Sequence, residues 1–299
     1  MNYFLHLLIY FNIYAIVALS LNMIVGYSGL LTLAHAGYFA VGGYTYALAT
    51  TVMGWTFLPA LLLGILVSAL LSLATSLPAW RFSGDFFVMI SLAVQALLFS
   101  LFYNWSEPSA DVGTWANLTN GPFGIDGIPN PNILGVNFDT IGGMAVITTI
   151  TAGVCGLLSW LLLSSPWGRL LKAMRDDELA ARGLGKNVRL VKVQVFALAC
   201  GLVAVAGALY ASYVSYIDPT SASLEESILM LSFVLVGGVG NFRGPLIGAF
   251  ILLAIPELLR LLAMPDAVAA EVRLMAYGLL LVLMMHYRPQ GIAGIYRPE

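Results

Sequence analysis

The residues able to carry charge-based chemistry are most concentrated in one short stretch of the chain, residues 168–192. Of the 13 Lys and Arg in the sequence, seven lie there, and three consecutive acids, Asp176, Asp177 and Glu178, interrupt them. Placing ten charges at the centre of a bilayer would cost roughly 30 kcal/mol, so we expect this stretch to remain in water. The seven bases are Arg169, Lys172, Arg175, Arg182, Lys186, Arg189 and Lys192.

The same stretch has the residue spacing of a helix. Apolar residues recur at i, i+3, i+4, i+11 and i+14, which predicts a helix over about residues 169–184 with one apolar face. Glu178 precedes Arg182 by four residues, the favourable order for an ion pair on a helix. Gly183 and Gly185 are expected to end the helix. The apolar positions are Leu170, Ala173, Met174, Ala181 and Leu184.

Three interpretations of this charged helix are open. It could be a solvated connector, a helix lying on anionic lipid, or a helix that docks into a groove of a partner protein. Asp177 falls inside the predicted apolar face. On a lipid surface its carboxylate would face acyl chains, whereas a protein groove could offer it a hydrogen-bond donor. The pattern therefore leans towards docking to a partner.

Five polar residues lie inside otherwise apolar stretches: Asn22, Ser28, Thr32, His35 and Gln95. In lipid each of them needs a partner or a wet surface. Ser28, Thr32 and His35 are spaced i, i+4 and i+7, so they would share one helix face and could line a pathway for a zwitterionic solute. The other interpretation, which we favour for His35 and Asn22, is hydrogen bonding between packed helices. A lone His35 is not expected to bind a metal ion.

The sequence lacks the clusters that catalysis would need. No group of His, Asp or Glu has metal-binding or acid–base spacing, which counts against a membrane-embedded enzyme. No G-x-x-x-x-G-K-[ST] motif for nucleotide phosphates is present, since Gly185-Lys186 is followed by Asn187. A secondary transporter, the other alternative, would normally need titratable groups within its spans, and apart from His35 the expected spans offer little to titrate.

The elements that must position these residues are membrane-spanning helices. The 299 residues are 60% hydrophobic and 9% charged, whereas soluble domains have about 25% charged residues. Apolar runs near the ~20 residues that cross a bilayer recur without the alternation of a barrel. We expect one all-α transmembrane domain over residues 1–299 with about eight or nine spans, in which the glycine-rich segments 25–44 and 235–249 could be broken or re-entrant. The expected spans are 3–25, 29–50, 57–77, 86–103, 141–163, 190–216, 225–240, 245–263 and 272–287.

The distribution of Lys and Arg predicts the orientation of the chain in the membrane. Residues 82–168 contain none, and their polar, Gly- and Pro-rich middle, about residues 104–140, is expected to be an external loop. The basic segment, about residues 168–189, is then cytoplasmic. Counting spans outward places the N-terminus outside and the C-terminus in the cytoplasm. Another external turn is expected near residues 218–226, whose acids would dock a binding protein or simply be solvated: Asp218, Glu225 and Glu226.

The charged segment also resembles the cytoplasmic coupling loop of ABC importer permeases. The signature of that loop has paired alanines and a glycine four residues after the second, which Ala180, Ala181 and Gly185 match. The signature's acid would fall at Leu179, whereas here the acid is Glu178, as in the branched-chain amino acid branch of these permeases. The resemblance to that branch, and within it to the M-type permease subunit, is carried by "LSLNMIVGYSGLLTLAHAGYFAVGGYTYAL" (19–48), "GDFFVMISLAVQ" (84–95), "LTNGPFGIDGIP" (118–129), "YIDPTSASLEESILMLSFVLVGGVGNFRGPLIGAF" (216–250) and "RPQGIAG" (288–294).

The resemblance implies a non-catalytic permease subunit of an ATP-driven importer, which brings branched-chain or related small neutral amino acids through a bacterial-type inner membrane. The partners that it implies are the lipid bilayer, a second homologous permease subunit or a second copy of this chain, two cytoplasmic ATPases and an external substrate-binding protein. It implies no binding of nucleic acid. ATP and Mg²⁺ would be used by the ATPases, and this chain would bind no cofactor. Permeases for urea, short amides or aromatic acids are the alternatives within the same class. The residues that would couple the chain to the ATPases are Arg169, Lys172, Arg175, Asp176, Asp177, Glu178, Ala180, Ala181 and Gly185.

Overall fold

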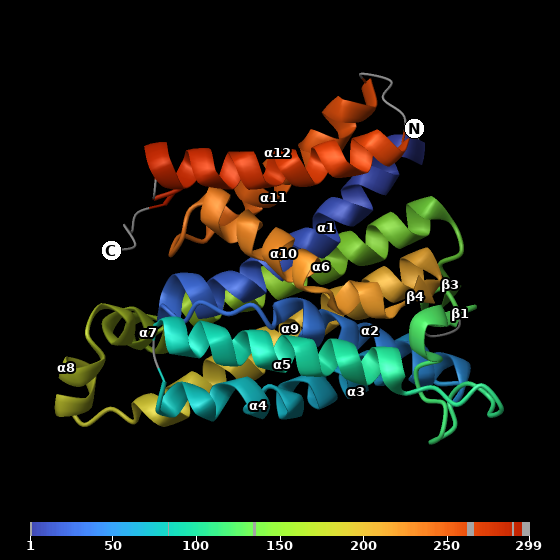
Figure 1. Ribbon diagram of the computed structural model, residues 1–299, viewed down its shortest axis with the longest axis horizontal. Coiled ribbons are helices and arrows are strands. Elements are labelled where there is room, and N and C mark those ends of the chain that lie inside the picture. The colour runs from blue at the N-terminus through green and yellow to red at the C-terminus, as the bar shows by residue number, and fades with distance from the viewer. Residues whose placement is uncertain (1, 83, 134–135, 262–265, 289, 295–299) are drawn as a thin grey trace.

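The computed structural model of the chain describes residues 2–82, 84–133, 136–261, 266–288 and 290–294. Its long helices run along the long axis of the molecule, and irregular segments gather at the two ends (Figure 1). Strand β1 (Ile125–Asp126) pairs antiparallel with β4 (Tyr216–Ile217), and β2 (Asn132–Ile133) with β3 (Val136–Asn137). The helices in chain order are α1 (Asn2–Asn22), η1 (Met23–Tyr27), α2 (His35–Thr51), α3 (Phe57–Leu71), α4 (Leu73–Ser76), η2 (Pro78–Trp80), α5 (Asp85–Asn104), η3 (Gly121–Phe123), α6 (Ile141–Ser164), α7 (Pro166–Asp176), α8 (Glu178–Gly183), α9 (Val188–Val214), η4 (Pro219–Ala222), α10 (Leu224–Gly237), α11 (Arg243–Leu261) and α12 (Asp266–Tyr287).

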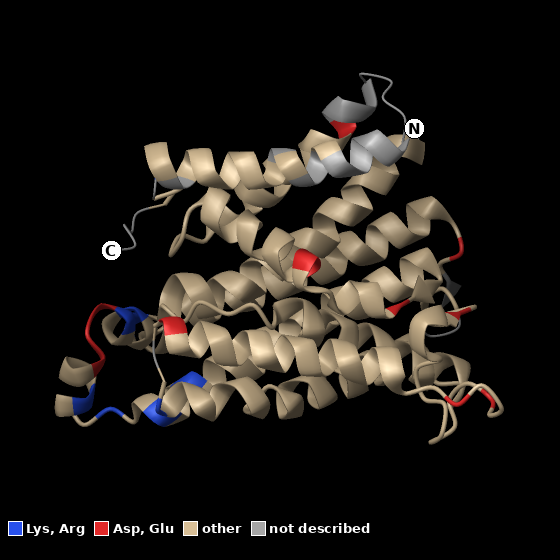
Figure 2. Cartoon of the chain, in the orientation of Figure 1, with Lys and Arg blue, Asp and Glu red and all other residues tan. Residues whose placement is uncertain are grey.

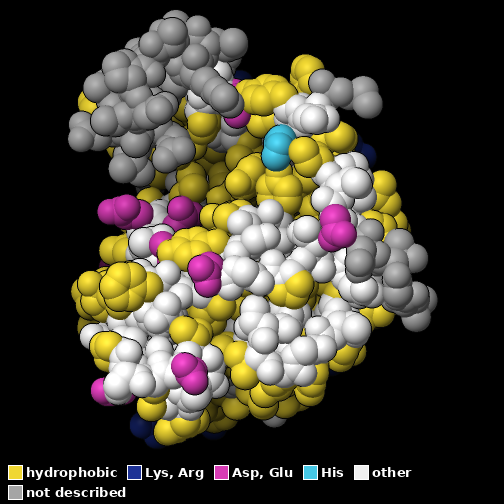
Figure 3. Space-filling view, turned by 90° about the vertical axis from the view of Figure 1, so that its right-hand side faces the viewer, with side chains coloured by type: hydrophobic (Ala, Val, Ile, Leu, Met, Phe, Trp, Pro, Cys, Tyr) yellow, Lys and Arg dark blue, Asp and Glu magenta, His cyan; other side chains and the backbone are white. Residues whose placement is uncertain are grey.

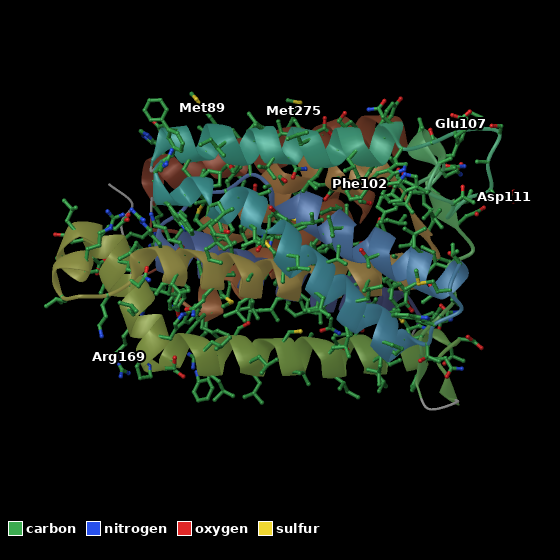
Figure 4. All side chains as sticks on the ribbon, turned by 90° about the horizontal axis from the view of Figure 1, so that it is seen from below. Met89, Phe102, Glu107, Asp111, Arg169 and Met275 are labelled. Carbon is green, nitrogen blue, oxygen red and sulfur yellow. The ribbon has the colours of Figure 1, made fainter. Side chains whose placement is uncertain are left out.

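The two ends of the molecule differ in charge. Helices α7 and α8 lie at one end, together with a group of Lys and Arg, and we call it the basic end (Figure 2). Residues 105–140 lie at the opposite end, which we call the loop end. Figure 4 shows that α5 connects the two, because Met89 lies on the side of Arg169 and Phe102 on the side of Glu107. Gln95 is half-way along α5 and is therefore near the middle of the helix bundle.

Among the described residues, five helices are long and apolar enough to cross a membrane. This confirms the all-helical membrane architecture. The other predicted ranges are helical over most of their described residues, but α2 has 17 residues and α10 has 14, short of the ~20 that a hydrocarbon core requires. The total of eight or nine spans therefore stays a prediction. The five segments are Asn2–Tyr27, Phe57–Ser76, Asp85–Asn104, Ile141–Ser164 and Val188–Val214.

The predicted span 29–50 is partly wrong. Helix α1 ends in the π-helical turn η1, and α2 begins only at His35. The chain leaves the helical path at Gly29, whose φ of +71° is a conformation that glycine adopts without strain. Thr32 lies in the non-helical connection, so it does not share a helix face with Ser28 and His35 as the spacing predicted. The prediction that the glycine-rich segment 25–44 is broken is confirmed.

The second glycine-rich segment is broken as well. Helix α10 ends at Gly237 and α11 starts at Arg243. Between them Gly238 has a φ of +119° and Gly240 a φ of +78°. These conformations turn the chain sharply and let it lie against residues 290–294. The contact includes a hydrogen bond from Ile292 N–H to the Val236 carbonyl at 3.0 Å.

Helix α9 forms the centre of the bundle, and glycines allow α2 to pack directly on it. A side chain at Gly207 of α9 would meet the Phe39 carbonyl oxygen at 1.9 Å. A side chain at Gly42 of α2 would meet Ala204 Cα at 2.3 Å. Small residues let membrane helices approach until their backbones touch, and dispersion then stabilises the pair. The α2–α9 contact consequently depends on these two glycines.

Replacing Gly207 with valine is expected to push α2 away from α9. Overpacking a tight interface costs roughly 1–3 kcal/mol, and backbone contact on both sides places this site at the upper limit. The thermal unfolding temperature of the purified protein should fall clearly. Gly153→Val in α6, where nothing lies within 4 Å of an added Cβ, is the matched control and should unfold as the unaltered protein does. Equal unfolding temperatures for the two variants would contradict this packing.

Candidate functional site

The charged segment at the basic end forms two short helices rather than the single helix predicted. The break is at Asp177, whose extended backbone (φ −154°, ψ 105°) separates α7 from α8. Its Oδ1 accepts a hydrogen bond from Ala180 N–H at 2.9 Å and caps α8. An aspartate that satisfies a free N–H at a helix start stabilises that start, here at the cost of helix continuity. The carboxylate of Asp177 therefore finds its hydrogen-bond donor within the charged segment itself.

The break changes which residues face the bundle. Of the predicted apolar positions, Met174 and Ala181 are buried and Leu170 is partly buried, whereas Ala173 is exposed. Leu184 is 80% exposed and Leu179 is 77% exposed. Two of the five predicted apolar positions, Ala173 and Leu184, are therefore wrong, and the buried Leu171 was not among them. Two leucines instead point away from the bundle at the outermost part of the basic end.

Helix α7 is attached to the end of α1. Arg175 Nη1 donates to the Gly26 carbonyl at 2.7 Å, and its side chain is only 10% exposed. Gly26 belongs to the π-helical turn η1, where a carbonyl is displaced from its usual intrahelical partner. Lys172 lies over the Tyr27 ring of the same turn, 5.0 Å from its centroid. Movement of α7 would thus act directly on the last turn of α1.

Helix α8 is attached to the turn before α5. Lys192, at the start of α9, is 4% exposed. Its Nζ donates to the Ala79 carbonyl at 2.8 Å and to Glu178 Oε2 at 3.0 Å. Glu178 also pairs with Arg182, as its spacing predicted. The sequence analysis counted Lys192 among the solvated bases and missed this role. The position of Lys192 between Val191 and Val193 was the signal in the sequence that its side chain is buried.

In the middle of the bundle, Gln95 joins the beginnings of two helices. Its Oε1 accepts from Gly37 N–H, in the first turn of α2, at 2.9 Å. Its Nε2 donates to the carbonyls of Ala222 and Ser223, which immediately precede α10. Both helices start inside the bundle, so their first N–H groups and the preceding carbonyls need partners there. One buried carboxamide provides both a donor and an acceptor.

His35 and two serines complete this junction. His35 Nε2 is 2.8 Å from Ser20 Oγ of α1, and Ala36 N–H donates to Ser227 Oγ of α10 at 3.2 Å. His35 Nδ1 is buried and has no partner among the described residues. The structure therefore brings His35 and Gln95 together around the start of α2. The interhelical hydrogen bond expected for His35 is present.

The remaining predicted pathway residues lie elsewhere. Asn22 joins α1 to the turn between α10 and α11, because its Nδ2 donates to the Asn241 carbonyl at 3.0 Å and its Oδ1 accepts from Gly240 N–H at 3.2 Å. Ser28 Oγ donates to the Ile24 carbonyl within its own helix end at 2.7 Å. Thr32 Oγ1 accepts from Ala34 N–H, two residues away. Ser28 and Thr32 thus satisfy local backbone groups, Asn22 satisfies those of a distant turn, and the three do not converge on one surface.

The acids expected in an external turn are deeper than predicted. Glu225 and Glu226 lie in the first turn of α10, directly after Ser223. Because Ser223 is bonded to Gln95, half-way along α5, these carboxylates are near mid-depth of the bundle. Docking of a binding protein at these residues and Asp218 stays a prediction. Residues 216–223 run from the loop end towards the middle of the bundle. The hydropathy pattern does not indicate this path because the segment is short and contains Pro219.

The fold and site together define a multi-pass membrane protein without a metal-binding cluster of His, Cys, Asp or Glu in the part of the chain that the structure describes. A family profile described as "Branched-chain amino acid transport system / permease component" matches residues 3–285. The chain belongs to this family. As such it is a non-catalytic membrane subunit of an ABC transporter, for which no cofactor is expected.

Individual relatives agree with this assignment. The permease protein LivM of the high-affinity branched-chain amino acid transport system of Salmonella typhimurium is 32% identical, over 96% of this chain and 69% of that protein. The probable branched-chain amino acid transport permease protein LivM of Methanocaldococcus jannaschii is 26% identical, over 96% of this chain and 92% of that protein. The autoinducer 2 import system permease protein LsrC of Salmonella typhimurium is 30% identical, over 48% of this chain and 41% of that protein.

Replacing Gln95 with leucine is expected to destabilise the middle of the bundle. The change leaves the Gly37 N–H and two carbonyls without partners, and each unsatisfied buried group costs about 1–3 kcal/mol. The unfolding temperature should fall, and the amides of the first turn of α2 should exchange faster with deuterium. Leu97→Ala, at a position of the same helix that is 69% exposed, should change neither reading. Unaltered amide exchange in Gln95→Leu would contradict the joining role of Gln95.

Proposed function

We propose that this chain is the transmembrane subunit through which an ATP-driven importer moves branched-chain amino acids into a bacterial-type cell. The proposed assembly contains a second permease subunit or a second copy of this chain, two cytoplasmic ATPases that use ATP and Mg²⁺, and an external substrate-binding protein. The observation that carries the proposal is the pair of exposed leucines, Leu179 and Leu184, on a segment that hydrogen bonds anchor to two parts of the bundle.

An ATPase that binds α8 would move several helices at once. Residues 168–189 act as the coupling segment in this proposal. Arg175 passes displacement to η1 and α1, and Lys192 passes it to η2 and hence to the start of α5. Asn22, the residue directly before η1, extends the connection to the turn between α10 and α11. Hydrogen bonds to carbonyls at helix ends resist displacement along their axes and are suited to such transmission.

The charge distribution supports an orientation with the basic end in the cytoplasm. Lys and Arg gather around α7 and α8 (Figure 2), as the positive-inside rule requires of cytoplasmic segments. The loop end seen face-on carries several acidic side chains, with basic side chains only at its edge (Figure 3). Residues 104–140 are then external. In this orientation α1 starts outside, α12 ends inside, and the nine predicted ranges form eight or nine spans.

Replacing Leu179 with serine is expected to uncouple transport from ATP hydrolysis. Burying a leucine in a partner groove contributes about 1.5–3 kcal/mol, so its loss should weaken ATPase binding roughly tenfold or more. The readings are ATP-driven leucine uptake in vesicles and the amount of ATPase that co-purifies with the chain. Leu179→Met, which keeps the apolar contact, should behave as the unaltered protein. Normal uptake and co-purification of Leu179→Ser would contradict docking through α8.

The orientation is tested with single cysteines and a membrane-impermeant thiol reagent. In Asp111→Cys, at the loop end, the thiol should react in intact cells. In Lys186→Cys, at the basic end, it should react only after the membrane is permeabilised. Both positions are exposed, and the native Cys155 and Cys200 are buried, so background labelling should be low. The reverse labelling pattern would refute the orientation.

A further inference from the structure

Three carboxylates line a cavity of about 410 Å³ between α1, α10, α11 and α12. They belong to Glu225 and Glu226 of α10 and to Glu257 of α11. The two in α10 lie near mid-depth of the bundle, because the residue that caps this helix is hydrogen-bonded to Gln95. A charged side chain at that depth costs about 2.5–3.5 kcal/mol and is usually kept for a function. The cavity is within the size range of small-molecule sites, about 300–1,000 Å³.

The rest of the lining is apolar and aromatic. Leu7, Leu229, Phe233 and Leu252 form hydrophobic walls. Three tyrosines, Tyr10, Tyr14 and Tyr277, add aromatic faces and hydroxyl groups. Tyr277 uses its hydroxyl to donate to the Leu252 carbonyl at 3.3 Å. Such a lining, with a few polar groups on a hydrophobic surface, fits a small molecule that has both a charged and an apolar part.

One carboxylate of this cavity has unused hydrogen-bonding capacity. Glu257 Oε2 is buried and has no partner within the described ranges. Tyr10 and Tyr14, which also line the cavity, bring phenol hydroxyl groups to it. A buried carboxylate oxygen without a donor is costly, and a bound cationic group would remove that cost. The described acids do not form a metal-binding group, so a metal ion is not the cation that they fit.

We propose that this cavity binds the transported solute as a zwitterionic amino acid with an aliphatic side chain. The ammonium group pairs with the carboxylates of Glu225, Glu226 and Glu257. The hydroxyls of Tyr10 and Tyr14 donate to the carboxylate of the solute. The aliphatic side chain lies against the hydrophobic walls. The site rests on the proposed import function and narrows it, because urea and short amides have no positive charge to pair with three acids.

The test uses protection of a cysteine placed in the cavity wall. Leu229→Cys is made in the complete transporter, in membranes without ATP, and the rate of its reaction with N-ethylmaleimide is measured. L-Leucine should slow the reaction, and so should leucinamide, which keeps the ammonium group. 4-Methylpentanoate, which lacks the ammonium group, and urea should have no effect at the same concentrations. Equal protection by leucine and 4-methylpentanoate, or no protection by leucine, would overturn the proposal.

The carboxylates are tested by neutral replacements in the same background. Glu226→Gln and Glu257→Gln should each raise the leucine concentration for half-protection by roughly tenfold or more, the typical loss for a charged hydrogen bond. The unprotected labelling rate should stay constant, which shows that the cavity is intact. Glu107→Gln, in the exposed part of the loop end, is the control and should bind leucine normally. Unchanged half-protection in both cavity variants would overturn the site.

These readings are separate from those of the proposed function. Leucine protection is measured without ATP, so it does not depend on coupling. An unaltered transporter that accumulates leucine with ATP but shows no leucine protection would refute the cavity and retain the import function. An unaltered transporter that shows ammonium-dependent protection but no ATP-driven uptake would refute the import function and retain the cavity.

Discussion

The structure depends on how backbone polar groups are satisfied where helices begin inside the membrane. A helix that starts in lipid leaves its first N–H groups without partners, and water is not available to hydrate them. Here α2 and α10 start at similar depth, and the Gln95 side chain accepts from one and donates to the carbonyls before the other. Ser227 provides a further acceptor for α2. A few buried side chains thus provide the hydrogen-bond partners that allow α2 and α10 to start inside the bundle.

The same interruptions connect the proposed coupling segment to the proposed solute cavity. Lys192 joins α8 to the turn that precedes α5, and α5 carries Gln95 to the start of α10. Glu225 and Glu226 follow within the first turn of α10 and line the cavity. A displacement at the basic end can therefore reach the cavity through α5, without passing through the large α2–α9 contact in the centre of the bundle.

Much of the fold could be predicted from composition and spacing. Most of the helical ranges and the breaks in both glycine-rich segments follow from local signals, and the structure agrees with them, except that the range 29–50 is helical only from His35. The break at Asp177 could not be predicted from periodicity, since a single side-chain cap outweighs a helical repeat over residues 169–184. The depth of Glu225 and Glu226 depends on a contact with Gln95, which is 130 and 131 residues away in the chain. Hydrogen bonds between residues so far apart in the chain cannot be predicted from the hydropathy pattern.

The short strand pair β1–β4 connects the surface of the loop end to the interior of the bundle. Ile125 and Asp126, in the segment between α5 and α6, are paired with Ile217 and Tyr216. Tyr216 also donates its hydroxyl hydrogen to the Phe123 carbonyl at 3.0 Å. Residues 216–223 then descend to α10. A displacement of residues 123–126 at the loop end would thus be passed through a connection of only a few residues to the start of α10 in the middle of the bundle.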